Sequence, residues 1–256
     1  MGLARAISKS GFCSRSAAFS LIRDGRVRVN GSPVRDPEKP TDLERDRIEI
    51  DGQPLAAPEK IYLMLNKPRG VVTTASDEKG RETIYAYLDS NLPWLAPVGR
   101  LDKASEGLLL LTNDSEWAAR VTAPETHIDK TYHVQIATIA DEILLSALTR
   151  GIRCSGELRR VKDTRVLRHG GKNSWLEIIL DEGKNRQIRR MMDAIGVEVL
   201  RLLRVAIGPL VLGDLKKGES RRLSQEEKKS IDSMRQQESM RSEVESKKRT
   251  AEKPKT

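Results

Sequence analysis

A single carboxylate, Asp102, stands between two cations in the segment Gly99–Gly107. Arg100 and Lys103 are its close neighbours, and opposite charges favour its ionised form. The apolar run 108–111 follows at once and is typical of a buried strand. A carboxylate on a loop tied to a rigid strand is well placed to act as a nucleophile or a general base. The bland alternative is a surface loop whose charges cancel.

A second segment, residues 182–191, supplies guanidinium groups that such a carboxylate needs. Apolar residues at helical spacing predict a helix with one buried side, at Ile188, Met191, Met192 and Ile195. Polar residues occupy its other sides near the helix start, at Arg186, Gln187, Arg189 and Arg190. Free backbone N–H groups at a helix start favour phosphate or a nearby carboxylate. Taken alone, the segment is more typical of an ordinary basic amphipathic helix.

Residues 130–136 alternate and predict a strand that begins at Lys130. Tyr132 shares one face with Val134 and Ile136, and His133 lies on the opposite, solvent side. Core packing is the simpler role for Tyr132. The alternative is a platform on which a nucleobase stacks, which contributes roughly 1–3 kcal/mol.

The chain has 256 residues and a formal net charge of +9, which favours a polyanionic partner such as nucleic acid. No apolar segment is long enough to enter a membrane. The start of the chain lacks the apolar stretch of a signal peptide, so we expect a cytoplasmic protein. The two cysteines do not pair with the three histidines at metal-ligand spacing. No glycine-rich nucleotide motif occurs, so we expect neither metal nor cofactor.

Three parts follow one another along the chain. Residues 1–58 predict two short helices and short strands, studded with arginines. Residues 59–223 alternate predicted strands with helices, which indicates an α+β domain built on a large mixed sheet with flanking helices. Residues 224–256 are charged and nearly free of aliphatic side chains, so we expect a disordered tail or a frayed helix.

Together these segments resemble the bacterial ribosomal RNA pseudouridine synthase family of the RsuA, RluB, RluE and RluF type. Residues 14–31 resemble the small RNA-binding domain named after a ribosomal protein of the small subunit. The catalytic-domain signatures match in order at residues 67–70, 99–102, 107–114, 130–132 and 182–191. Five ordered matches are far more specific than any one of them. They favour the functional interpretations of these residues over surface charge and ordinary core packing.

The resemblance implies an active site in a cleft across the sheet. Asp102 would be the catalytic aspartate, Tyr132 would stack on the target uracil, and Arg189 would pair with Asp102. Arg100 would occupy or steady the space that the flipped nucleotide leaves. Lys130 and Arg186 are further candidates for substrate binding, and either Leu202 or Leu203 would line the pocket.

The expected function is the isomerisation of a specific uridine in ribosomal RNA to pseudouridine, without a cofactor, by a monomer. The substrate is either free RNA or a ribosome assembly intermediate. The competing class is a non-catalytic ribosome-associated RNA-binding protein, for which charge and the N-terminal part would suffice. A third class, an acid–base hydrolase, needs a second carboxylate near Asp102. Glu106 is the only close candidate in sequence, and we expect it to be a solvated loop residue.

Overall fold

The computed structural model describes residues 1–56, 58–75 and 77–234. Its N-terminal unit contains α1 (Leu3–Lys9) and α2 (Arg15–Arg23), and Ser14 begins α2 by accepting a hydrogen bond from the Ala17 N–H. A four-stranded sheet of order β2-β1-β3-β4 follows, with β1 Val27–Val29, β2 Ser32–Val34, β3 Ile48–Ile50 and β4 Gln53–Pro54. Asn30 and Gly31 both have positive φ, as the tight turn between β1 and β2 requires.

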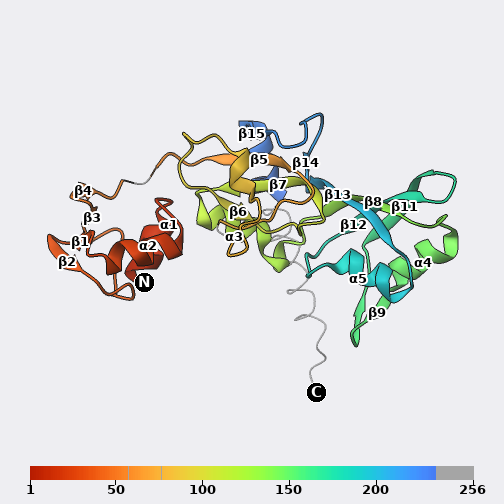
Figure 1. Cartoon of the computed structure of the whole chain (residues 1–256), viewed down its shortest axis with the longest axis horizontal. Helices are drawn as coiled ribbons and strands as arrows, with labels where there is room; N and C mark the ends of the chain where they lie inside the picture. The colour runs from red at the N-terminus through yellow and green to blue at the C-terminus, as the bar shows by residue number, and fades with distance from the viewer. Residues whose placement is uncertain (57, 76, 235–256) are drawn as a thin grey trace, which may run out of the picture.

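The larger unit is built on one mixed sheet of order β11-β12-β8-β13-β7-β5-β15, with β6 beside β7 and β14 beside β13 (Figure 1). Its strands are β5 Tyr62–Lys67, β6 Ala96–Val98, β7 Glu106–Thr112, β8 Lys130–Ile136, β11 Asp163–His169, β12 Ser174–Leu180, β13 Val199–Ile207, β14 Leu210–Val211 and β15 Ser220–Arg222. The neighbours β13 and β7 run parallel, at Leu203 and Arg204. The predicted α+β class with a large mixed sheet is confirmed.

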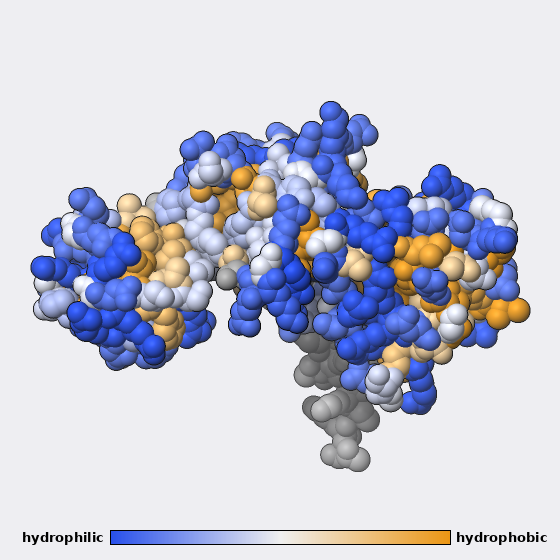
Figure 2. Space-filling model, viewed as in Figure 1, coloured by the Kyte–Doolittle hydropathy of each residue, from blue (hydrophilic) through white to orange (hydrophobic). Residues whose placement is uncertain are grey.

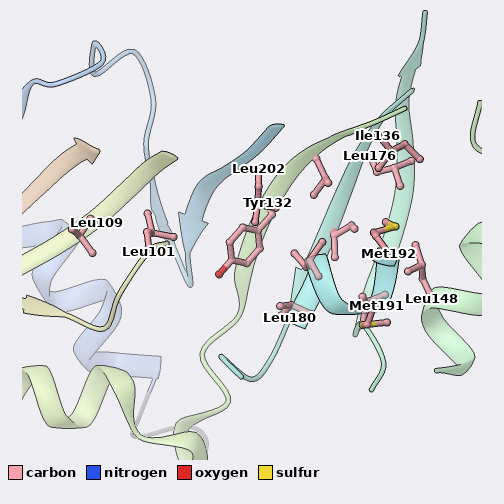
Figure 3. Packing of buried hydrophobic residues seen from close by; sticks show 14 of the residues in the cluster. Leu101, Leu109, Tyr132, Ile136, Leu148, Leu176, Leu180, Met191, Met192 and Leu202 are labelled. Atoms are coloured by element: carbon pink, nitrogen blue, oxygen red, sulfur yellow. The ribbon is translucent and has the colours of Figure 1, made fainter. Parts of the chain in front are cut away.

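Helices cover opposite faces of the two halves of this sheet. The helices are α3 Ser115–Thr122, α4 Glu142–Arg150 and α5 Gln187–Ala194, with the short turns η1 Ile84–Tyr87 and η2 Pro124–Thr126 and the separate hairpin of β9 Ile152–Cys154 and β10 Glu157–Arg159. Side chains of α4 and α5, Leu148, Met191 and Met192, pack with Tyr132 and Leu176 on one face (Figure 3). Trp117 of α3 packs with Leu108 and Ile207 on the other. Strand β7 is buried along its whole length because it faces both clusters.

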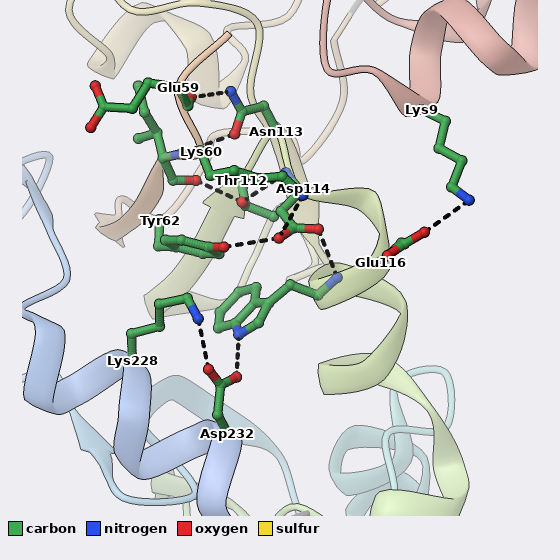
Figure 4. Close-up of polar contacts among 12 residues, drawn as sticks. Lys9, Glu59, Lys60, Tyr62, Thr112, Asn113, Asp114, Glu116, Lys228 and Asp232 are labelled. Carbon is green, nitrogen blue, oxygen red and sulfur yellow. Dashed lines mark hydrogen bonds and ion pairs between the residues drawn. The ribbon is translucent and has the colours of Figure 1, made fainter. Parts of the chain in front are cut away.

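From residue 224 we expected a disordered tail or a frayed helix, and the described part of this segment is a helix that packs on the larger unit. Residues 225–234 are helical, and Ile231 is buried in the cluster around Trp117. The Trp117 indole N–H donates to Asp232 at 2.9 Å, and Lys228 pairs with the same carboxylate while lying over the Tyr62 ring (Figure 4). The low aliphatic content of this segment predicted no packing. One isoleucine at the right helical position is nevertheless enough to anchor the helix. Residues 235–256 of that predicted tail lie outside the described residues.

Outside the hydrophobic clusters, the surface consists mainly of hydrophilic residues. Hydrophilic residues cover much of the N-terminal unit and the middle of the face in Figure 2, and hydrophobic ones gather at the end that holds α4. Ile143 of α4 and Leu158 of β10 are exposed there. The Lys9 ammonium pairs with Glu116 of α3 at 2.8 Å, which joins the N-terminal unit to the larger one (Figure 4). None of the helices in the described ranges is long and apolar enough to cross a membrane.

Candidate active site

The loop that carries Asp102 joins β6 to β7 at the middle of the sheet. Gly107, one residue into β7, has a φ of +101°, which side chains rarely adopt. A Cβ there would overlap the Arg204 carbonyl oxygen and lie 2.9 Å from the Arg204 nitrogen. Glycine at this position therefore lets β13 approach β7 closely enough to pair in parallel. The Asp102 loop is thereby placed against β13.

Every backbone carbonyl from Leu101 to Ser105 accepts a hydrogen bond from outside the loop. Thr73 Oγ1 donates to the Leu101 carbonyl at 2.7 Å, and the Gly70 N–H donates to that of Lys103 at 2.7 Å. Lys67 Nζ donates to the carbonyls of Asp102 at 3.2 Å and Ser105 at 2.8 Å. Arg189 Nη2 donates to the Ala104 carbonyl at 3.1 Å. Hydrogen bonds from ionised donors are the stronger ones, and two of these three donating side chains are cations. The loop is therefore held at its main chain, and the Asp102 side chain is left free to project.

Lys67 is a functional residue that sequence reasoning missed. It ends β5, is fully buried, and also donates to the Pro68 carbonyl at 3.0 Å. Burial lowers its pKa to about 8, against the attraction of Asp102 and Glu106. The available signal was a lysine at the end of an otherwise buried strand, 62–67. A charge at such a position is retained only where acceptors surround it.

The arginine that pairs with Asp102 is Arg186, which corrects the prediction of Arg189. Arg186 Nη1 lies 3.5 Å from Asp102 Oδ2, and both side chains are partly exposed. Arg189 instead donates to the carbonyls of Ala104 and Val199, the latter at 3.3 Å. The reason is the start of α5: Arg186 is its N-cap in a left-handed conformation, φ +51°. Burial, followed by the charge of Arg186, lowers the pKa of Arg189, while Asp102 acts in the opposite direction.

A cavity of about 660 Å³ opens beside Asp102. Tyr132 is buried in its wall with Leu202, and the two side chains lie next to each other in Figure 3. Leu203 packs against the cluster on the opposite face, so the open choice between the two leucines is resolved for Leu202. The remaining predicted residues, Arg100, Lys130 and Arg186, also line the cavity. All the predicted site residues except Arg189 thus border one space.

Two polar residues that sequence reasoning did not single out line this cavity. Arg204 is buried and donates from Nε to the Leu108 carbonyl at 2.8 Å, but its Nη2 has no partner among the described residues. The Ser105 hydroxyl is likewise buried without a partner within the described ranges. Buried polar atoms of this kind are costly unless something satisfies them. Both residues line the cavity, but these two atoms themselves are buried from it.

Glu106 does not serve the hydrolase alternative, and it is not the solvated loop residue that we expected. It begins β7, and its side chain is only 5% exposed. Arg201 Nε lies 2.9 Å from one carboxylate oxygen, and Lys217 Nζ lies 3.3 Å from the other. Burial opposes ionisation, but the hydrogen bond and charge of Arg201, with those of Lys217, outweigh it and lower the pKa of Glu106. An ion-paired carboxylate outside the cavity lining is unsuited to a proton-donating role.

Comparisons with known proteins give the same picture over nearly the whole chain. The family described as RNA pseudouridylate synthase matches residues 61–194, and the S4 domain matches residues 1–55. The chain is 38% identical to "Ribosomal large subunit pseudouridine synthase B" of Bacillus subtilis (strain 168) over 232 residues, 90% of this chain and 94% of that protein. The chain belongs to the RNA pseudouridine synthase family.

Further relatives of this pseudouridine synthase agree. An "Uncharacterized RNA pseudouridine synthase" of Aquifex aeolicus (strain VF5) is 38% identical, covering 86% of this chain and 89% of that one. A solved structure described as "Crystal structure of pseudouridylate synthase" is similar with a TM-score of 0.63 and 35% identity, covering 90% of this chain and 99% of that one. The pseudouridine synthase is therefore an isomerase that modifies RNA, and the expectation of a non-catalytic RNA-binding protein is not favoured.

Proposed function

We propose that this pseudouridine synthase converts a specific uridine of ribosomal RNA to pseudouridine, with Asp102 as the catalytic carboxylate. The observation that carries the proposal is the shared cavity, which is lined by Asp102, its partner Arg186, Tyr132 and Leu202. The name of the Bacillus subtilis relative supports RNA of the large ribosomal subunit as the substrate.

The reaction breaks the bond between uracil N1 and the ribose, turns the ring, and joins carbon 5 to the same sugar carbon. The carbon 5 proton leaves and N1 gains a proton, so no redox partner is required. Asp102 attacks the ring, attacks the sugar carbon, or removes a proton from the sugar, and each route requires its ionised form. Arg186 is placed to orient the carboxylate, with its Nη1 3.5 Å from Asp102 Oδ2.

The target base must leave its stack before it can enter the cavity, which costs a few kcal/mol. Stacking on Tyr132 offsets part of this cost. Arg100 is placed to fill the vacated space, and Lys130 and Arg186 to hold phosphates at the rim.

The test is replacement of Asp102 by asparagine, with Asp181→Asn as the matched control that removes another carboxylate lining the same cavity. We expect Asp102→Asn to bind ribosomal RNA and to release no tritium from RNA labelled at carbon 5 of uracil. Asp181→Asn should keep its turnover within about tenfold, since it removes only a nearby charge. Turnover by a pure Asp102→Asn sample, checked for deamidation, would defeat the assignment.

A further inference from the structure

The half of the sheet that α4 and α5 cover on one side is open on the other. Along β12 the buried residues Leu176 and Ile178 alternate with Trp175 and Glu177, which are partly exposed. The strand register places Arg168 of β11, Trp175 of β12, Gln135 of β8 and Arg201 of β13 opposite one another. Facing residues of neighbouring strands point to the same side of a sheet. One row across four strands therefore presents an aromatic ring flanked by arginines.

Two arginines flank the Trp175 ring. The Arg168 guanidinium carbon lies 5.3 Å from the ring centroid, and that of Arg201 lies 5.6 Å from it. These are cation–π distances. No acceptor for the Trp175 indole N–H is found in the described part of the chain, whereas the buried Trp117 donates to Asp232. An indole that is left partly exposed with a free donor is available to a partner.

The row itself carries two arginines and no carboxylate. Two carboxylates elsewhere on this face are paired, Glu106 with Arg201 and Lys217, and Glu177 with Arg165 at 2.7 Å. Asp163, opposite Ile179, has no ion pair among the described residues. Arg168 and the exposed Lys172 of the neighbouring turn have no carboxylate within ion-pair distance among the described residues. An arginine stacked on an indole keeps its N–H edge outward, in the planar fork that binds phosphate.

This face lies on the other side of the sheet from the wall of the catalytic cavity. Arg201 pairs with Gln135, whereas the next residue, Leu202, pairs with Val134 on the face of Tyr132 and lines the cavity. We call Arg201, Trp175, Arg168 and Lys172 the arginine–tryptophan stripe.

We propose that the arginine–tryptophan stripe binds the sugar–phosphate backbone of the substrate RNA outside the catalytic cavity. The inference rests on the proposed function only for the source of that RNA. An acidic protein segment is the competing occupant. It is disfavoured because an aromatic ring among arginines suits nucleotides better than carboxylates.

The test compares two double variants that remove the same charge. Arg168→Gln with Lys172→Gln alters the stripe, and Arg150→Gln with Arg153→Gln alters exposed residues of α4 and β9. The full chain is titrated with a short labelled oligouridylate at several salt concentrations. We expect the stripe variant to reduce the slope of log affinity against log salt by about 1.5, because each phosphate contact contributes about 0.7–0.9. The control should keep the slope of the unaltered protein.

Tryptophan fluorescence gives a second readout. Oligouridylate should quench the fluorescence of the unaltered chain. Trp175→Phe should remove that response, and its slope of log affinity against log salt should match that of the control double variant. Equal slopes for both double variants, or quenching that survives Trp175→Phe, would overturn the proposal. Polyglutamate that binds as tightly as oligouridylate and is lost in the stripe variant would assign the face to an acidic protein instead. Turnover on ribosomal RNA is measured separately, so a failure of the proposed function remains distinguishable.

Discussion

Lys67→Met is the most informative single change, because it removes a buried charge and leaves a side chain of similar length. Lys67 Nζ donates to the carbonyls of Pro68, Asp102 and Ser105 at 2.8–3.2 Å. Hydrogen bonds to charged groups contribute about 1.5–3 kcal/mol each, so about 5–9 kcal/mol is lost. The pKa of Lys67 falls from 10.5 to about 8, so removing the charge returns about 3 kcal/mol. We expect net destabilisation of about 2–6 kcal/mol.

The sign of the pH dependence follows from the same pKa. Below about pH 8 the lysine is protonated in both the folded and the unfolded chain, so it contributes no slope. Between about pH 8 and 9.5 the unfolded chain binds more protons, and the free energy of unfolding rises with pH by up to about 2 kcal/mol. Lys67→Met should lack this rise.

The assays are urea unfolding at several pH values and tritium release at neutral pH. Lys79→Met, at an exposed loop position, is the matched control. Turnover should fall by about 100-fold in Lys67→Met, because displacement of a catalytic group by about 1 Å has that effect. If Lys67→Met unfolds at the same urea concentration as Lys79→Met and shows the same pH slope, the account of the loop is wrong.

Three further changes test other contacts. Gly107→Ala should lower the free energy of unfolding by at least about 2 kcal/mol more than Gly156→Ala, since both glycines have positive φ but open space surrounds only Gly156. Calorimetry measures the free energy of unfolding of both variants. Equal losses would show that the close approach of β13 to Gly107 is not the cause. Arg186→Gln should change stability by less than about 1 kcal/mol, because its pair with Asp102 is partly exposed; kcat should fall about tenfold in the tritium assay, and an unchanged kcat would deny it a role in orienting Asp102. Ile231→Ala should lower the free energy of unfolding by about 2–4 kcal/mol, as measured in urea. A change no larger than that of exposed Lys229→Ala would show that residues 225–234 are not packed on the larger unit.

Periodicity and motif order predicted the elements and most of the cavity lining. Tyr132 was placed on the buried face of its strand by simple alternation, and the structure puts it there. The strand after Asp102 followed from its leucine run. These features depend on local patterning, which a sequence displays directly. The same patterning left Leu202 and Leu203 as alternatives, since only the pairing of β13 decides which leucine faces the cavity.

Features that depend on the meeting of distant segments were missed. Helical spacing alone does not distinguish Arg186 from Arg189 as the partner of Asp102, because the left-handed N-cap turns Arg186 out of the helical series. Glu106 looked like a solvated charge because Arg201 and Lys217 are about a hundred residues away along the chain. Ile231 looked isolated in a charged sequence until Trp117 was placed beside it.

The separate sequence signatures are joined physically at the main chain of the Asp102 loop. Lys67 and Gly70 come from one signature and Arg189 from another, yet all three donate to carbonyls of residues 102–105. A loop held through its carbonyl oxygens tolerates changes in its side chains, since those bonds do not involve them. This explains how a set of donors spread over 120 residues positions one carboxylate. It also gives Arg189 a reason to be present although Arg186 makes the contact with Asp102.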